Sequence, residues 1–149
     1  MQIQWSCLKL SEMSPETLYK VIQLRELVFV VGQECIYLDC DGKDIDCLHV
    51  IGTDTQKNQV VATARLYTKT SDLASFGRVA THPDVRGKGI GKELVLQSIQ
   101  AIKKDFSLNK IEISAQSYLE KFYSDFGFQK EGEEYLDTGI PHIKMTGTF

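Results

Sequence analysis

The stretch VATHPDVRGKGIG, residues 79–91, decides how this chain is interpreted. It begins as an apolar, strand-like segment, breaks at Pro83, and then places Gly87, Gly89 and Gly91 at alternate positions before a helical pattern. Glycines tolerate backbone conformations that turn successive N–H groups toward one point. The helix that follows adds unpaired N–H donors and the positive end of its dipole. Such a loop is typical of phosphate or pyrophosphate binding.

Basic side chains flank these glycines. Lys88 and Lys92 supply positive charge, and Arg86 either anchors the loop or contacts the ligand. The P-loop pattern does not fit, because Arg86 stands where its first glycine belongs and Glu93 follows Lys92. The dinucleotide fingerprint does not fit either, since Lys92 stands at its third glycine.

Hydrophobic periodicity on both sides of the loop predicts a mixed α/β sheet. Helices are expected after Ser14, after Gly91 and after Ser117, where helical spacing of apolar residues follows a capping or glycine position. The expected strands are 3–8, 47–52, 60–67, 74–81, 111–113, 128–136 and 142–148. This order requires a crossover connection in the centre of the sheet.

Length and composition indicate one globular domain. The chain has 149 residues, of which 42% are hydrophobic and 25% charged, and no repeat or low-complexity tract divides it. With 17 Lys+Arg against 20 Asp+Glu, the net charge is −3, so a whole-protein basic field for nucleic acid is excluded. No apolar run reaches the length of about 18 residues that a membrane span needs. The start, MQIQWSCLKL, lacks the pattern of a secretory signal, so we expect a cytoplasmic protein.

The cysteines and the acidic segment 39–44 show no pattern that indicates catalysis or metal binding. Cys7, Cys35, Cys40 and Cys47 have no metal-ligand spacing and are expected to be reduced thiols, with no metal bound. The segment 39–44 is expected to be a solvated acidic loop.

Three polar residues lie in apolar segments. His49 is expected to be a partly buried histidine with a hydrogen-bond partner. Arg25 and Arg78 each either pair with a carboxylate or line a substrate cleft, because an unpaired charge there is costly.

Residues 79–91 resemble the acetyl-CoA motif of the GNAT superfamily of N-acetyltransferases, whose core is [Q/R]-x-x-G-x-[G/A]. A second element, FYSDFGF at residues 122–128, is similar to the aromatic helix of that superfamily that ends in Tyr-x-x-x-Gly-Phe. Residues 24–31, 77–79, 115–116 and 139–142 are similar to the ElaA-like branch. On this resemblance, residues 1–149 form a single N-acetyltransferase domain.

The resemblance implies a mixed central sheet with splayed parallel strands and helices on both faces. Acetyl-CoA, the acyl donor, is then expected in the gap between strands 76–81 and 111–116. Backbone groups of residues 79–81 hold the pantetheine arm, the loop 86–91 holds the pyrophosphate, and a backbone N–H near residue 79 polarises the thioester. The implied acetyl-CoA-binding residues are Val79, Ala80, Thr81, Arg86, Gly87, Lys88, Gly89, Ile90, Gly91 and Gln116.

The implied reaction is direct attack on acetyl-CoA by a primary amine of a small molecule or a protein, in a ternary complex. Tyr123 aligns with the general acid that protonates the departing thiolate. Ordinary pKa values, about 8.5 for a thiol and about 10 for a phenol, make that transfer uphill by roughly 2 kcal/mol. A lowered Tyr123 pKa, near the helix and its lysines, would remove this gap.

The acceptor side stays open. Glu34, Glu112, Asp137, His142 or a water relay could supply the general base. The chain also departs from the ElaA pattern there, with Gly32 in place of a glutamate and residues 136–139 in place of Glu-Asp-Gly. The expected partners are therefore acetyl-CoA, CoA and an unidentified amine, with no nucleic acid or membrane, in a monomer or homodimer. The alternative is a non-catalytic CoA-binding sensor or interaction module.

Overall fold

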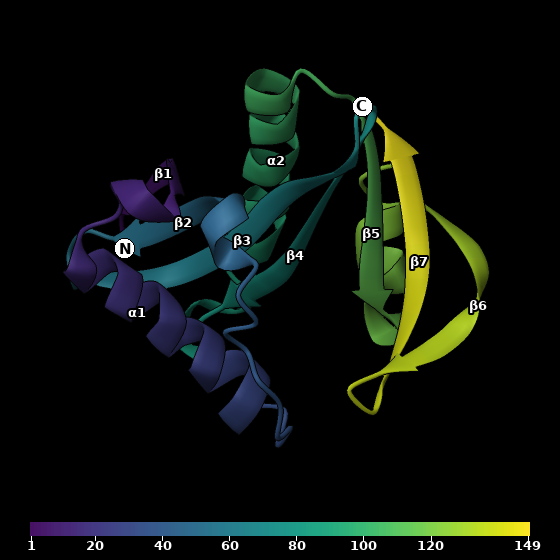
Figure 1. Cartoon of the computed structure of the whole chain (residues 1–149). Coiled ribbons are helices and arrows are strands. Elements are labelled where there is room, and N and C mark those ends of the chain that lie inside the picture. The colour runs from purple at the N-terminus through teal and green to yellow at the C-terminus, as the bar shows by residue number, and fades with distance from the viewer.

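The computed structural model describes residues 1–149 as one seven-stranded mixed sheet with helices on both faces (Figure 1). The strands are β1 (Ile3–Lys9), β2 (Leu48–Asp54), β3 (Gln59–Thr70), β4 (Leu73–Thr81), β5 (Lys110–Gln116), β6 (Gln129–Asp137) and β7 (Ile140–Thr148). The helices are α1 (Pro15–Arg25), α2 (Ile90–Ala101) and α3 (Glu120–Ser124). The strand order is β1-β2-β3-β4-β5-β7-β6, and only β4 and β5 are parallel neighbours. The predicted mixed α/β sheet is confirmed.

Capping residues set the helix limits. The Ser14 hydroxyl accepts a hydrogen bond from the Thr17 N–H at 3.1 Å, and Pro15 occupies the first helical position, so α1 begins as predicted. The helix continues as a wider π-helical segment, Glu26–Val31, before Gly32. The helix expected after Ser117 is shorter than the pattern indicates, because a 3₁₀ turn precedes the single α-helical turn of α3.

Alternating side chains of the strands build two cores on opposite faces of the sheet. On β2, Val50 packs with the larger core, which includes Leu94 and Val95 of α2. Its neighbour Ile51 packs on the other face with Val21 and Leu24 of α1. Helices therefore cover both faces, as the resemblance implies.

The sheet opens between its two parallel strands. β4 and β5 pair at a single position, Ala74 with Ile111, near the start of both strands. Figure 1 shows the two strands meeting near the C-terminal end of the chain and then separating. A β-bulge accompanies the divergence: Thr63 pairs with Ala80 but Arg65 pairs with Gly77, so two residues of β4 oppose one of β3. The predicted splay is thus present in the fold.

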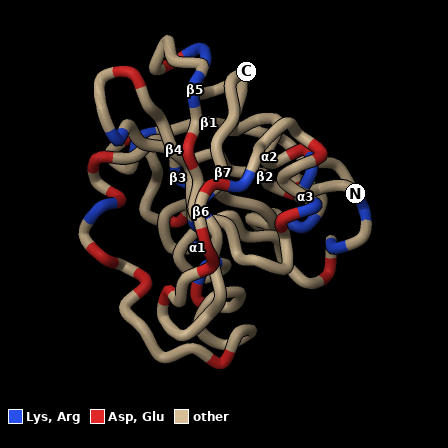
Figure 2. Tube along the Cα trace, turned by 90° about the vertical axis from the view of Figure 1, so that its right-hand side faces the viewer, with Lys and Arg blue, Asp and Glu red and all other residues tan.

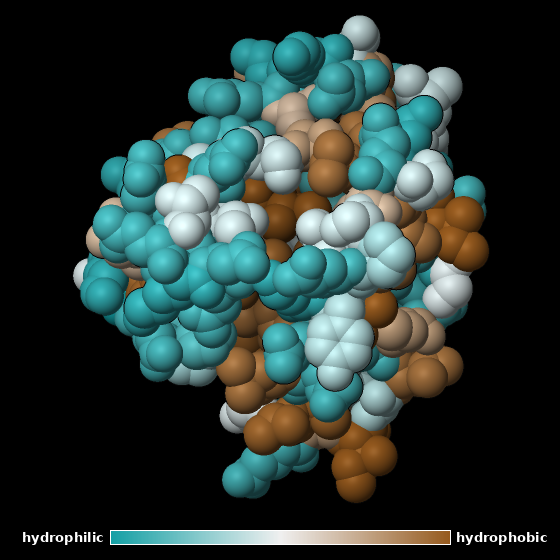
Figure 3. Space-filling view, turned by 90° about the vertical axis from the view of Figure 1, so that its left-hand side faces the viewer, coloured by the Kyte–Doolittle hydropathy of each residue, from teal (hydrophilic) through white to brown (hydrophobic).

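The surface carries charges of both signs. Figure 2 shows basic and acidic residues interspersed on the side that carries β6 and β7. Figure 3 views the side of α1 and β1, where hydrophilic side chains cover most of the surface and apolar ones gather at the lower end. Val31, Ile36 and Leu38 are exposed apolar residues of the segment that follows α1. None of the helices is both long and apolar enough to cross a bilayer.

The larger core gives a direct stability prediction. Leu94 of α2 has no exposed surface, so Leu94→Ala leaves a cavity and is expected to lower the free energy of unfolding by about 2–5 kcal/mol. Leu96→Ala, on the same helix but 37% exposed, is the control and is expected to cost less than about 1 kcal/mol. Urea unfolding followed by circular dichroism measures both. Equal losses would contradict the packing described.

Candidate functional site

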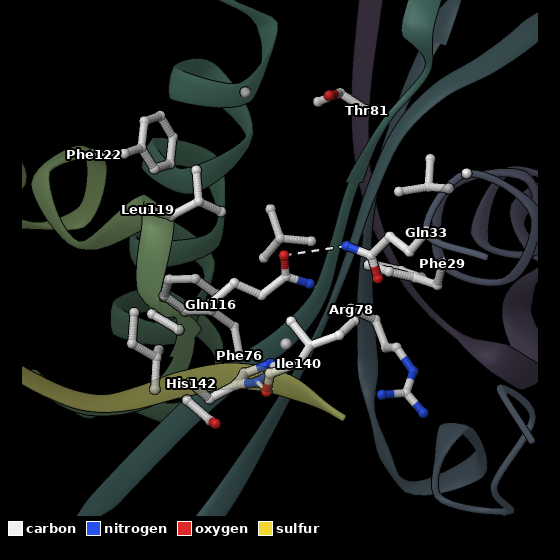
Figure 4. A pocket seen from close by; sticks show the side chains of 18 of the residues that line it. Phe29, Gln33, Phe76, Arg78, Thr81, Gln116, Leu119, Phe122, Ile140 and His142 are labelled. Atoms are coloured by element: carbon white, nitrogen blue, oxygen red, sulfur yellow. Dashed lines mark hydrogen bonds between the residues drawn. The ribbon is translucent and has the colours of Figure 1, made fainter. Parts of the chain in front are cut away.

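A cavity of about 1050 Å³ lies where β4 and β5 diverge. Its walls come from the π-helical segment and the loop that follow α1, from β3, from β4 and the glycine loop, from β5 and the α3 turn, and from the β6–β7 hairpin. Figure 4 shows Gln116 and His142 on one side of this pocket and Gln33 and Arg78 across from them. The cavity is large enough for a cofactor-sized ligand.

The glycine loop forms one end of the pocket. Gly87 and Gly89 have φ values of +76° and +80°, in the left-handed region that other residues rarely adopt. No side chain caps the start of α2 at Gly89, so the first N–H groups of this helix stay free to bind an anion. Arg86 donates to the Thr81 carbonyl at 3.3 Å, which joins the loop to the end of β4. Lys92 adds positive charge to the pocket lining.

Most residues that the resemblance implies for acetyl-CoA binding line this one pocket. Val79, Thr81, Arg86, Gly87, Gly89, Ile90, Gly91 and Gln116 do so. Ala80 does not, because its side chain packs in the core under α1 while its backbone pairs with Thr63. Lys88 is exposed and lies outside the lining.

A pair of glutamines bridges the opened sheet. The Gln33 side-chain amide, from the segment after α1, donates to the Gln116 side-chain oxygen at 3.1 Å. The dashed line in Figure 4 shows this bond crossing the pocket from the side of α1 to the end of β5. Any ligand that threads between β4 and β5 at this level displaces the bond or exchanges its partners.

Tyr123 also lines the pocket, from α3. It is 5% exposed and packs against the rings of Phe76, Phe122 and Phe128. Burial raises the pKa of the Tyr123 phenol above its ordinary value. The lowering that would remove the gap to the thiol is therefore absent, because burial and the neighbouring Tyr118 both raise this pKa.

Two of the four candidate bases lie at the pocket. Asp137 and His142 line it, whereas Glu34 and Glu112 do not. Glu112 is instead paired with Lys69 and Lys144 on the outer part of β5.

A network of arginines and aspartates lies at the end of the pocket away from the glycine loop, and it was not predicted from the sequence. The predicted solvated acidic loop is wrong, because three aspartates of this loop pair with arginines from α1, β3 and β4. The members are Arg25, Arg65, Arg78, Asp39, Asp41 and Asp44. The sequence indicated part of this network, since an arginine inside an apolar segment requires a carboxylate partner. It did not indicate which carboxylates those partners are.

Distances show how tight this network is. Asp44 accepts hydrogen bonds from Arg25 at 2.7 Å and from Arg65 at 3.2 Å. Arg78 lies 2.9 Å from Asp39 and over the Tyr37 ring, with its guanidinium turned away from the gap in Figure 4. The expected pairing of Arg78 with carboxylates is thus confirmed, and its side chain also lines the pocket.

The expectations for His49 and for the cysteines can also be compared with the structure. His49 is 1% exposed, and its Nε2 lies 3.0 Å from the Asp44 carbonyl, so the expected buried, hydrogen-bonded histidine is confirmed. The four cysteines are free thiols, and Cys35 is one of the pocket residues.

Comparison with known proteins identifies the family to which this fold and pocket belong. The family model for the acetyltransferase (GNAT) domain matches residues 48–149. The chain is 37% identical to protein ElaA of Escherichia coli, over 96% of this chain and 95% of ElaA. It is 42% identical to the UPF0039 protein sll0451 of Synechocystis sp., over 97% of this chain and 95% of that protein.

Two solved structures are similar over almost their full length. The crystal structure of Escherichia coli ElaA has a TM-score of 0.90 at 34% identity, covering 98% of this chain and 99% of that chain. The crystal structure of an acyl-CoA N-acyltransferase from Pseudomonas aeruginosa has a TM-score of 0.89 at 32% identity, covering 97% of this chain and 99% of that chain.

The arginine–aspartate network predicts acid-sensitive stability. Partial burial raises the pKa of Asp44, but the hydrogen bonds and charges of Arg25 and Arg65 outweigh it, so this pKa lies below its ordinary value. The stabilisation is therefore complete above the unfolded-state pKa of about 3.9 and is lost as the pH falls through the lower folded-state value. Asp44→Asn is expected to cost about 1–3 kcal/mol at pH 7, because Arg25 and Arg65 each lose one of two carboxylate partners and keep Asp39 and Asp41, respectively.

Denaturant unfolding at pH 7 and at a series of lower pH values measures the free energy of unfolding of each variant. The wild type is expected to lose stability below about pH 4, and Asp44→Asn to lose less over the same range. Asp46→Asn is the matched control, since Asp46 is exposed and forms no ion pair. Parallel acid profiles for the wild type and Asp44→Asn would contradict the role of the network.

Proposed function

The chain belongs to the acetyltransferase (GNAT) family, and on this premise we propose that it is an acetyl-CoA-dependent N-acetyltransferase acting on a primary amine of a small molecule or a protein. The observation that carries the proposal is the opening between β4 and β5, which ends at a glycine loop and a free helix N-terminus. Residues 1–149 would form a single N-acetyltransferase domain in this proposal.

The donor side consists mainly of backbone groups. β4 and β5 have facing edges that are unpaired beyond Ala74 and Ile111, and backbone groups of this kind need hydrogen-bond partners. A pantetheine arm carries amides, so it can pair with residues 79–81 as an added strand does. The pyrophosphate would then reach residues 86–91 and the start of α2. The name of the similar Pseudomonas aeruginosa protein, an acyl-CoA N-acyltransferase, supports this donor class.

The bulge of β4 supports a position for the thioester beside Val79 in this proposal. Arg78 has a φ of +49°, and the pair Arg78–Val79 opposes a single residue of β3. A bulge leaves one residue outside the ladder, so a backbone N–H beside Val79 is available for the thioester oxygen. Such a donor would stabilise the negative charge of the tetrahedral intermediate.

Tyr123 is proposed as the acid on the leaving-group side. The amine nitrogen attacks the thioester carbon, the C–S bond breaks, and the CoA thiolate takes the phenolic proton. The raised pKa keeps the phenol protonated at neutral pH, so the proton is present when the thiolate forms. The raised pKa also makes it unfavourable to transfer the phenolic proton before the C–S bond breaks. The proton therefore moves as negative charge develops on the sulfur.

Loss of the anion site provides a test of donor binding. Gly89→Asp places a side chain at a φ of +80° and a negative charge in the loop, so the Kd for acetyl-CoA is expected to rise roughly tenfold or more, about 1.4 kcal/mol, in titration calorimetry. Gly132→Asp is the matched control, because Gly132 has a φ of +77° and lies on exposed β6. Absence of binding by the folded wild type would overturn the proposed function.

Removal of one hydroxyl tests the proposed acid. Tyr123→Phe keeps the ring packing and is expected to lower kcat by roughly 10²-fold or more while leaving the Kd for acetyl-CoA unchanged. Steady-state acetyl transfer to a panel of primary amines measures the change in kcat. Tyr19→Phe is the control, because the Tyr19 side chain is exposed on the surface of α1. Equal turnover would remove Tyr123 from the acid role. Tight acetyl-CoA binding without turnover of any amine would indicate a CoA-binding module instead.

A further inference from the structure

His142 is held in one neutral tautomer by the main chain. Its Nδ1 lies 2.7 Å from the carbonyl oxygen of Ile140. A carbonyl oxygen only accepts, so Nδ1 must carry the proton and donate it. In the neutral ring the lone pair is then on Nε2, and no group of the chain hydrogen-bonds this atom. The local structure therefore prepares Nε2 to accept a proton.

The ring is fixed in orientation by its neighbours. It is 9% exposed, and the Tyr135 ring lies at 28° to it with a centroid separation of 6.2 Å. The Tyr135 hydroxyl is itself hydrogen-bonded to Ser114 of β5, and this bond fixes the Tyr135 ring against the imidazole. His142 is also one of the pocket residues, so a defined imidazole faces the cavity.

His142 and Tyr123 reach the pocket from opposite faces of the sheet. Ile113 and Ala115 of β5 point into the core that contains Tyr123. Side chains alternate along a strand, so Gln116 points to the other face, and its register partner on β7 is His142. Figure 4 shows Gln116 and His142 on the same side of the pocket. The gap in the sheet connects the two faces.

We propose that His142 is the general base of the transfer, an inference that rests on the proposed function. The protonated amine of the acceptor first gives one proton to Nε2, and the imidazolium releases it to water, which restores the neutral ring. As the amine nitrogen bonds to the thioester carbon, its N–H proton passes to Nε2, which becomes the imidazolium. The C–S bond breaks on the other face of the sheet, where Tyr123 protonates the sulfur. The imidazolium then releases its proton to water, and Tyr123 regains one.

The other candidates fit this role less well. Glu34 and Glu112 do not line the pocket, and Glu112 is held by two lysines. Asp137 lines the pocket but is exposed, and an imidazole is ordinarily a stronger base than a carboxylate in water. The ionisable groups around His142 are Tyr135 and Asp137 on β6, Lys144 on β7 and Arg78 across the gap on β4.

The test separates loss of the base from loss of structure. In His142→Asn the side-chain amide can still donate to the Ile140 carbonyl, but the basic Nε2 is gone. Acetyl-CoA affinity is measured first, by calorimetry. Acetyl transfer is then compared for the best alkylamine of a panel, which is protonated at neutral pH, and for aniline, which is not. Glu112→Gln, outside the pocket, is the control variant.

The expected result is a loss of roughly 10²-fold or more in kcat/KM with the alkylamine, a loss below about tenfold with aniline, and an unchanged Kd for acetyl-CoA. The acid limb of the alkylamine pH profile should also become shallower. Equal losses for both amines, or none, would overturn the base. A His142→Gln variant and long-range ¹H–¹⁵N spectra of the wild-type imidazole give independent readouts, and a protonated Nε2 in the neutral ring would contradict the proposal.

A failure of the proposed function has a different signature. If the folded wild type binds no acetyl-CoA or acetylates no amine, the proposed transferase function is wrong, and the proposed role of His142 is overturned together with it. If the wild type is active and His142→Asn matches it, only the base is overturned.

Discussion

The structure depends on one interrupted pairing, because β4 and β5 are parallel neighbours that share only the Ala74–Ile111 position. Beyond it, two strand edges face each other inside the sheet with backbone groups that lack a ladder partner, and such groups are costly to leave unpaired. The fold tolerates this opening because the larger core continues across it on one face of the sheet, with Ala74 and Phe76 of β4 and Ile111 and Ile113 of β5 in the same cluster. A ligand that brings its own amides can satisfy the edges, so the same gap that costs stability creates the site.

The arginine–aspartate network lies beside the bulge that accompanies the gap. Arg78, with its positive φ, is at the bulge itself, and its guanidinium pairs with Asp39 and Asp41 of the loop after α1. Arg25 and Arg65 pair with the same loop from α1 and β3. The network thus joins α1, β3 and β4 at the end of the pocket away from the glycine loop, where buried charges favour one arrangement of the loop over others.

Local patterns were sufficient to predict the elements and the glycine loop before α2. Helical and alternating periodicity report burial directly, and the loop takes its shape from its own backbone, so its geometry can be predicted from consecutive residues. The acceptor side could not be predicted in the same way, because it is assembled from distant segments. The Gln33–Gln116 bond joins residues 83 positions apart, and the partners of Arg65 lie on a separate loop. The raised pKa of Tyr123 could not be predicted from the sequence either, since the burial that causes it comes from three aromatic neighbours in different parts of the fold.

The central claim is that acetyl-CoA occupies the gap between β4 and β5 and extends to the glycine loop. Amide hydrogen exchange, with and without acetyl-CoA, tests it most directly, because the ligand would pair with backbone groups. Slower exchange confined to residues 79–81, 87–91 and the end of β5 near Gln116 is the expected result. Protection located elsewhere, or no change at saturating acetyl-CoA, would contradict the account.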